Sequence, residues 1–420
     1  MVDTSSLTKR IAFLSVHGCP FARLGARDTG GMNVYVLELS RELADAGHTV
    51  DIFTRREDAA PRIERIAPNL RLIRIDAGPN QPLKKEEMIP FIPDFVKGIR
   101  GLIEETGDAY DIVHSHYWQS GLAGGDIAKA LAIPHVMMFH TLGEVKNRAR
   151  TSELEPSLRI EGERSLVAAA DVVMTASSHE RDLLQRYYGA KPDSLVTIPC
   201  GVDLDLFQPL DQAQSRRELG LHPEAPILLW VGRLEKLKGV DILIEALAQL
   251  DDRDFTLMLV GGDEHAADLK EELRSQAVEA GIAANIRFEG PVPHERLPVY
   301  YNAADVSVVP SYYESFGLVA VESMACGTPV VASRVGGLIS TVTDGVTGYL
   351  IPWRCPEPFA EKLEVILNNP ELRANFSLSA RKSVEKFRWS NIAGAVSELY
   401  GTLISRHAKA NPSSVRTTSS

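Results

Sequence analysis

The sequence predicts an α/β protein of two doubly wound domains that face each other across a central cleft. Short β-branched runs alternate with amphipathic helical segments along most of the 420 residues, a pattern that is typical of parallel sheets covered by helices. The alternation is interrupted at 199–210 and then starts again. Ligands of such sheets bind at the carboxyl ends of the strands, so we expect the site in the cleft between the two halves.

The first half is expected to hold one sheet with helices between its strands. The strands are predicted at 11–16, 49–54, 70–75, 112–115, 134–139, 172–175 and 195–198. The helices between them include 33–46, 86–104, 122–130 and 158–169. Gly47 follows the first of these helices, and glycine often ends a helix because it adopts a left-handed conformation easily. Glu161 and Glu163 are expected as exposed charges on the last helix.

The second half repeats the pattern after the linker at 199–210. Its strands are predicted at 226–231, 255–260, 286–289, 306–309 and 329–332, and its helices include 240–250 and 266–280. The predicted organisation is a first domain at 1–203, a second at 204–385, a C-terminal helix at 386–408 that is able to pack back on the first domain or stay with the second, and a disordered polar tail at 409–420.

The composition disfavours several classes of function. The net charge of −11 argues against a general binder of nucleic acid or of anionic membranes. The apolar runs have the length of strands and are far shorter than the roughly 20 residues of a membrane span. The first ten residues contain no apolar signal region, and the four cysteines are scattered without metal-type spacing. We therefore expect a cytoplasmic protein with reduced thiols, for which a homodimer stays open.

The most informative segment places Glu314 and Glu322 eight residues apart, on either side of a Ser-Phe-Gly-Leu step. That step predicts a loop that opens a helix, and the helix ends at Gly327. The start of a helix offers free backbone N–H groups and a partial positive charge, which suit a phosphate. An acid two turns further along is placed to reach the vicinal hydroxyls of a ribose. The segment therefore predicts a site for an activated sugar nucleotide.

Two further loops carry groups that suit a diphosphate. Gly30 and Gly31 precede the first helix and let the backbone approach a ligand closely. Arg233 and Lys238 follow the first strand of the second half, where arginine makes forked contacts to phosphate oxygens and lysine adds a point charge. The absence of a Gly-x-Gly-x-x-Gly fingerprint in the glycine loop disfavours an NAD site. A plain strand–helix turn and a solvated loop are the competing interpretations.

Histidines and aspartates raise the question of metal binding. His140 follows the fifth expected strand, where an imidazole can hydrogen-bond a sugar hydroxyl or a phosphate, or can simply fill the core. His114 and His116 share one face of a strand, but a third ligand is missing nearby. Asp203 and Asp205 resemble the Asp-x-Asp of metal-dependent transferases, yet they lie in the linker, where a turn is expected. We predict no metal.

Together, the twin-glycine loop, the Gly-Arg-x5-Gly segment with its lysine, and the Glu-x7-Glu element resemble the family 4 glycosyltransferases over roughly residues 10–405. The resemblance implies the GT-B fold, in which two Rossmann-like domains face a cleft. It implies a retaining glycosyltransferase that uses a UDP-sugar as donor substrate and needs no cofactor. The implied catalytic residues are Arg233, Lys238, Glu314 and His140, and the implied donor-binding residues are Gly30, Gly31, Arg233, Lys238, Val292, Glu314, Ser315, Phe316, Gly317, Leu318 and Glu322.

A narrower resemblance, to the D-inositol-3-phosphate glycosyltransferases of the mycothiol pathway, implies a small phosphorylated acceptor. Lysine, arginine and hydroxyl groups are the ones that a phosphomonoester needs. The acceptor-binding positions implied in this chain are His17, Asp28, Asn33, Lys85, Tyr117, Thr141 and Arg159. The first half therefore carries the expected phosphate contacts, with UDP-N-acetylglucosamine or UDP-glucose as donor and inositol phosphate as the acceptor that the resemblance favours.

The sequence departs from that narrower family at Arg23 and Leu24 and at Gly143 and Glu144. A glycine after His-Thr-Leu also resembles the sucrose-phosphate synthases, which transfer glucose from UDP-glucose to fructose 6-phosphate. That activity remains an alternative. A sugar-nucleotide epimerase or hydrolase on the same scaffold is a second one, because a fold does not determine its chemistry.

Overall fold

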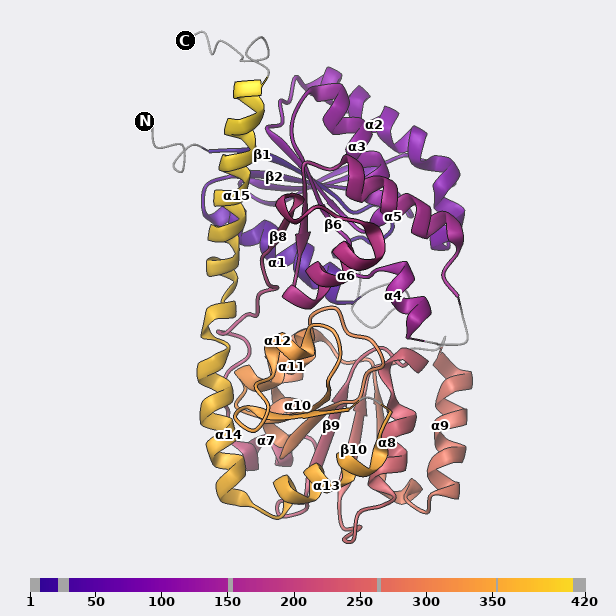
Figure 1. The fold of residues 1–420 in the computed structure, drawn as a ribbon, viewed down its shortest axis with the longest axis vertical. Helices are drawn as coiled ribbons and strands as arrows, with labels where there is room; N and C mark the ends of the chain where they lie inside the picture. The colour runs from indigo at the N-terminus through magenta and orange to yellow at the C-terminus, as the bar shows by residue number, and fades with distance from the viewer. Residues whose placement is uncertain (1–7, 22–29, 150–153, 263–265, 353, 411–420) are drawn as a thin grey trace.

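The computed structural model describes residues 8–21, 30–149, 154–262, 266–352 and 354–410. Asp28, Arg23 and Leu24 lie outside these ranges, and so does most of the predicted tail. Figure 1 shows two α/β domains stacked along the long axis, with the N-terminal domain above the C-terminal one. No helix in the described ranges is long and apolar enough to cross a membrane.

Within the described residues, the first sheet has eight strands in the order β3-β4-β2-β1-β5-β6-β7-β8, parallel except for the antiparallel pair of β3 and β4. Its strands are β1 (Arg10–Leu14), β2 (Thr49–Arg55), β3 (Ile63–Ala67), β4 (Leu70–Ile75), β5 (Ile112–His116), β6 (His135–Met138), β7 (Val172–Thr175) and β8 (Leu195–Thr197). Its helices are α1 (Gly31–Asp45), α2 (Ile92–Thr106), α3 (Trp118–Leu131), α4 (Gly143–Arg148), α5 (Ser157–Ala169) and α6 (Ser178–Tyr188). The sequence did not predict β3, an edge strand whose residues are largely exposed.

The helix predicted at 86–104 is in fact two elements. A 3-10 helix covers Lys85–Phe91, and α2 begins only at Ile92. Pro90 lacks the N–H that a continuous α-helix needs, whereas a proline in the first turn of α2 is well tolerated. The break leaves Lys85 at the start of the 3-10 helix rather than one residue before an α-helix.

The second sheet, counted over the same described ranges, has six parallel strands in the order β11-β10-β9-β12-β13-β14. They are β9 (Ile227–Val231), β10 (Thr256–Val260), β11 (Ile286–Gly290), β12 (Val306–Val309), β13 (Val330–Ser333) and β14 (Gly348–Ile351). The helices are α7 (Gln212–Glu218), α8 (Val240–Leu247), α9 (Ala267–Glu279), α10 (Leu297–Ala303), α11 (Leu318–Ala325), α12 (Leu338–Thr341), α13 (Pro356–Leu367), α14 (Pro370–Ser383) and α15 (Trp389–Ala410). The four-residue strand β14 was not predicted.

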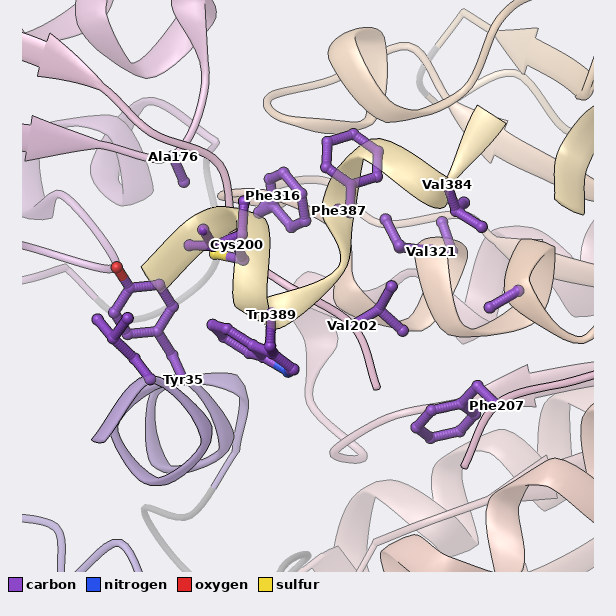
Figure 2. Packing of buried hydrophobic residues seen from close by; sticks show 14 of the residues in the cluster. Tyr35, Ala176, Cys200, Val202, Phe207, Phe316, Val321, Val384, Phe387 and Trp389 are labelled. Carbon is purple, nitrogen blue, oxygen red and sulfur yellow. The ribbon is translucent and has the colours of Figure 1, made fainter. Parts of the chain in front are cut away.

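The connection between the two domains is a packed joint. The Val202 N–H donates to the Phe387 carbonyl at 2.8 Å, which brings the linker beside the segment that leads into α15. A side chain at Gly201 would meet the ring of Trp389 at 2.2 Å, so only glycine fits there. Figure 2 shows Trp389 between Tyr35 of α1 and Val202 of the linker, with Phe387 next to Phe316. Buried side chains of both domains thus share one hydrophobic cluster.

The last helix, α15, packs on the first domain. Ser397 Oγ lies 2.8 Å from His48 Nε2, and the Tyr400 hydroxyl lies 2.6 Å from His114 Nδ1. The helix continues to Ala410, so the first two residues of the expected tail are helical. In the linker, Asp203 Oδ1 accepts the N–H groups of Asp205 and Leu206, both at 2.9 Å, which is the turn that the sequence predicts for this pair.

Candidate active site

A cavity of about 410 Å³ lies between the two domains, with walls from both. Among the residues that the structure describes, it brings together every predicted site residue except Arg159. The first domain contributes His17, Gly30, Gly31, Asn33, Lys85, Tyr117, His140 and Thr141. The second contributes Arg233, Lys238, Val292, Glu314, Ser315, Phe316, Gly317, Leu318 and Glu322. We refer to these two groups as the acceptor wall and the donor wall.

The donor wall is built around the start of α11. Gly317 precedes this helix with a φ of 92°, and a side chain there would also meet Leu338 at 2.7 Å. Both constraints favour glycine. The first N–H groups of α11 have no partner within the helix, and they open on the cavity next to Leu318. The helix start therefore offers hydrogen-bond donors and a partial positive charge to an anion.

Two cations flank that helix start, and each holds a carboxylate. Lys238 Nζ donates to Glu314 Oε2 at 2.7 Å, and Arg233 Nη1 pairs with Glu235 Oε1 at the same distance. The Arg233 side chain also reaches the first domain, because a Cβ on Gly30 would lie 3.5 Å from its Nε. The guanidinium thus lies between the twin-glycine loop and its own loop, where a diphosphate has room to meet both.

The second acid of the Glu-x7-Glu element is held by two residues that the sequence did not single out. Glu322 Oε1 lies 3.0 Å from His294 Nε2, and Glu322 Oε2 accepts the Tyr301 hydroxyl at 2.9 Å. Burial lowers the pKa of His294, but the hydrogen bond and charge of Glu322 outweigh it, so this pKa lies above its ordinary value. His294 also lines the cavity. In the sequence, its position shortly after the carboxyl end of a predicted strand was the signal that could have indicated a site residue.

His140 sits at the seam between the walls in a strained conformation. Its φ of 61° is left-handed, as is the φ of 73° at Tyr117, and such values are uncommon outside glycine. The His140 carbonyl accepts a hydrogen bond from Ser315 Oγ of the other domain. Burial lowers the pKa of His140 to about 3, so its imidazole is neutral at physiological pH. It can therefore orient a hydroxyl but does not carry a positive charge.

Behind His140 lies a chain of buried aromatic groups that includes His116, His114 and Tyr400. His116 Nδ1 is 3.1 Å from His140 Nε2, and the rings of His114 and His116 are 4.3 Å apart. His114 in turn contacts Tyr400 of α15. No group of three potential metal ligands occurs among the described residues. The chain connects the cavity to the C-terminal helix.

The acceptor wall is centred on the ring of Tyr117. The His17 ring lies 4.4 Å from it, the Lys85 ammonium 5.5 Å and the Arg159 guanidinium 4.9 Å. Thr141 Oγ1 accepts from Arg159 Nη2 at 2.9 Å. The predicted phosphate contacts therefore converge on one corner, although they come from separate elements.

The Asn33 side chain links two backbone segments of the acceptor wall. Its side-chain oxygen accepts the Gly30 N–H at 3.1 Å, and its amide donates to the Cys19 carbonyl at 2.9 Å. Because the oxygen and the nitrogen of its amide both bond to backbone groups, Asn33 fixes the glycine loop as well as lining the cavity.

Arg159 itself lies just behind the wall and is almost fully buried. Its Nε donates to Glu163 Oε1 at 2.7 Å, and its Nη1 pairs with Glu155 Oε2 at 2.8 Å. The prediction that Glu163 is an exposed charge was wrong, because its side chain has no exposed surface. Glu163 also accepts the Gly143 N–H and the Tyr188 hydroxyl. The i, i+4 spacing of Arg159 and Glu163 was the signal available in the sequence.

Comparison with known proteins agrees with this geometry. Residues 29–206 match the model described as Glycosyltransferase Family 4, and residues 211–383 match the one described as Glycosyl transferases group 1. The D-inositol 3-phosphate glycosyltransferase 2 of Catenulispora acidiphila is 41% identical, covering 95% of this chain and 96% of its own. The chain belongs to glycosyltransferase family 4. A Thermobifida fusca D-inositol 3-phosphate glycosyltransferase is also 41% identical, with 93% of both chains covered.

Solved structures place this glycosyltransferase in the GT-B fold. The sucrose-phosphate synthase of Thermosynechococcus elongatus superposes with a TM-score of 0.89 at 37% identity, covering 95% of this chain and all of the other. Anabaena Alr3699/HepE, solved with UDP and glucose, has a TM-score of 0.76 over 94% of this chain. At 21% identity the latter shows a common fold alone.

Proposed function

We propose that this glycosyltransferase transfers a sugar from a UDP-sugar to the hydroxyl of a small phosphorylated acceptor, with inositol phosphate as the acceptor and with retention of configuration at the sugar. One observation carries the proposal. A single cavity joins a helix start with two cations on one wall to a second cluster of cations and hydroxyls on the other. Two separate anion-binding regions are what a nucleotide donor and a phosphorylated acceptor require. The names of the 41% identical relatives support the choice of inositol phosphate.

In this proposal the donor wall stabilises the leaving group. The bond from the sugar's anomeric carbon to the UDP phosphate breaks, and its electron pair goes to the phosphate oxygen. Arg233, Lys238 and the N–H groups at the start of α11 face the region where this charge develops. Lys238 exchanges part of its contact with Glu314 for the phosphate, and Glu314 positions the donor sugar. Glu322, braced by His294 and Tyr301, holds the ribose hydroxyls.

The acceptor's hydroxyl attacks the same face of the sugar from which UDP departs. Its proton goes to the departing phosphate oxygen, so no protein nucleophile is required. The acceptor's phosphate contacts Lys85 and Thr141 beside Tyr117, with Arg159 directly behind them. His17 Nδ1 is buried without a hydrogen-bond partner among the described residues, and a ligand hydroxyl would satisfy it. Neutral His140 orients a sugar hydroxyl at the seam.

A second candidate acceptor is fructose 6-phosphate. The 37% identical sucrose-phosphate synthase favours it, and so does Gly143, because a glycine after His-Thr-Leu resembles the sucrose-phosphate synthases. The decisive experiment offers UDP-glucose and UDP-N-acetylglucosamine each to inositol phosphate, to fructose 6-phosphate and to the two unphosphorylated compounds. We expect product from inositol phosphate and little from inositol. Equal rates with the unphosphorylated compounds would refute the acceptor site, and rapid conversion of UDP-sugar alone would favour an epimerase or hydrolase.

A further inference from the structure

A carboxylate that the proposed reaction does not use lies directly behind the acceptor wall. Glu155, just before α5, places one oxygen against the Lys146 ammonium and the other 2.8 Å from Arg159 Nη1. Lys146 belongs to α4 and lines the cavity, whereas Glu155 does not. The carboxylate therefore draws one cavity-lining cation and one buried cation toward itself and away from the open space.

The position of Glu155 is fixed by its backbone as well as its side chain. Asn147 Oδ1 accepts the Glu155 N–H at 2.6 Å, and Asn147 Nδ2 donates to the Glu155 carbonyl at 3.4 Å. Burial raises the pKa of Glu155, but Arg159 and Lys146 outweigh burial, so this pKa lies below its ordinary value. The group is thus ionised near neutral pH, and Asn147 holds it in place beside both cations.

The balance of charge in this corner is unfavourable for a phosphate. Arg159 and Lys146 bring two positive charges, and Glu155 and Glu163 cancel both. A phosphate dianion placed next to this neutral cluster would meet carboxylates whose repulsion opposes it. The positive charge of Lys85 is additional to this cluster and lies 5.5 Å from the Tyr117 ring.

The two carboxylates differ in how firmly they are held. Glu163 has no exposed surface and is bound by the Gly143 N–H, the Tyr188 hydroxyl and Arg159 together. The Glu155 side chain is 16% exposed, and among the described residues its carboxylate pairs with the Lys146 ammonium and the Arg159 guanidinium. Glu155 can therefore leave and be hydrated at far smaller cost than Glu163.

We propose that Glu155 is the exchangeable counter-ion of the acceptor's phosphate site, and that Lys146 is a further phosphate-binding residue. In the empty enzyme the Glu155 carboxylate occupies Lys146 and Arg159. A phosphorylated acceptor displaces it, and the phosphate takes over both cations. An unphosphorylated acceptor cannot make this exchange, so the device would favour phosphorylated acceptors. The inference rests on the proposed function, because it presupposes an acceptor that carries a phosphate.

Binding of inorganic phosphate, followed by calorimetry at fixed ionic strength, tests the exchange. The variants are Glu155→Gln, Lys146→Met and, as a matched control, Glu161→Gln, which removes the same charge from an exposed site on α5. We expect Glu155→Gln to bind phosphate about tenfold more tightly and Lys146→Met about tenfold less tightly, because one charge pair near the surface is worth about that much. Glu161→Gln should bind like the wild type. Unchanged UDP affinity shows that each variant is folded.

The possible outcomes separate this inference from the proposed function. If Glu155→Gln binds phosphate no better than the wild type, Glu155 is a brace for Arg159 and the exchange is refuted. If Lys146→Met binds phosphate normally, Lys146 is not a ligand. Either result leaves the proposal of a phosphorylated acceptor unaffected. If the wild type and all variants bind UDP but not phosphate, the acceptor site itself fails, and the proposed function fails with it.

Discussion

The two walls of the cleft present positive charge in different ways. On the donor wall, Arg233 and Lys238 line the cavity beside the backbone N–H groups of α11, and each pairs with one carboxylate among the described residues. Behind the acceptor wall, Arg159 is buried and is held by the carboxylates of Glu155 and Glu163 and by Thr141. The cations of the donor wall thus line the cavity, whereas Arg159 belongs to a buried network behind the acceptor wall. Variants on the two walls should therefore fail differently.

The largest effect is expected from breaking the buried network at Glu163. Glu163→Gln leaves the buried Arg159 with a lost charge partner, and breaking a buried pair costs about 3–5 kcal/mol. The free energy of unfolding, measured by urea titration, should fall by this amount. Glu161→Gln on the same helix is exposed and should change stability by less than about 0.5 kcal/mol. Equal stability of the two variants would contradict the description of a buried network.

Arg233→Ala on the donor wall should reduce turnover and leave stability almost unchanged. Its side chain is 38% exposed, so stability should barely change. Turnover should fall on the order of 10²-fold or more, because the variant loses a group that stabilises charge on the leaving phosphate. Lys236→Ala is the control, since Lys236 lies in the same loop, is exposed and pairs with Glu272. Near-normal turnover of Arg233→Ala would remove that residue from the chemical step.

Arg159→Ala should separate substrate binding from chemistry on the acceptor wall. The KM for the phosphorylated acceptor should rise about tenfold or more, with a smaller change in kcat, because ground-state phosphate binding is lost. The KM for the donor should stay close to that of the wild type. Lys85→Met provides a second measurement that does not disturb Glu163. An unchanged acceptor KM in both variants would refute the phosphate assignment.

The difference between the walls also explains what the sequence could predict. Much of the donor wall comes from short contiguous motifs. Glu314 to Glu322 form one loop and the start of one helix, and their spacing already indicates a site for a sugar nucleotide. The alternation of strands and helices likewise predicts both sheets, apart from the short or exposed strands β3 and β14. Glu163 and His294 were missed because groups that hold them come from other elements: Gly143 and Tyr188 for Glu163, and Glu322 for His294. Burial of a charge depends on packing between those elements, which a one-dimensional pattern does not contain.

The seam between the walls offers a smaller and more specific test, through His116. The Nε2 of His116 is buried with no partner in the described part of the chain, and a buried N–H without a partner costs more than an unused lone pair. The proton of His116 therefore lies on Nδ1 and is donated to His140 Nε2, which leaves His140 with its own proton on Nδ1. His116→Leu should lower kcat about tenfold, because His140 loses its orientation. His116→Asn keeps a donor near Nδ1 and should restore most of the rate. Equal rates for the two variants would show that the hydrogen bond is irrelevant to turnover.

The smallest effect concerns pH and the donor wall. Glu322 raises the pKa of His294 above its ordinary 6.5 in the folded state. A raised pKa means that the folded protein binds this proton more tightly than the unfolded chain does. The stabilisation is therefore fully present below pH 6.5 and is lost as the pH rises through the folded pKa. Urea titrations across this range should show that loss in the wild type but not in His294→Gln. If both proteins follow the same pH profile, the proton is not shared between His294 and Glu322. Of the two partners of Glu322, only Tyr301 would then hold this carboxylate in place.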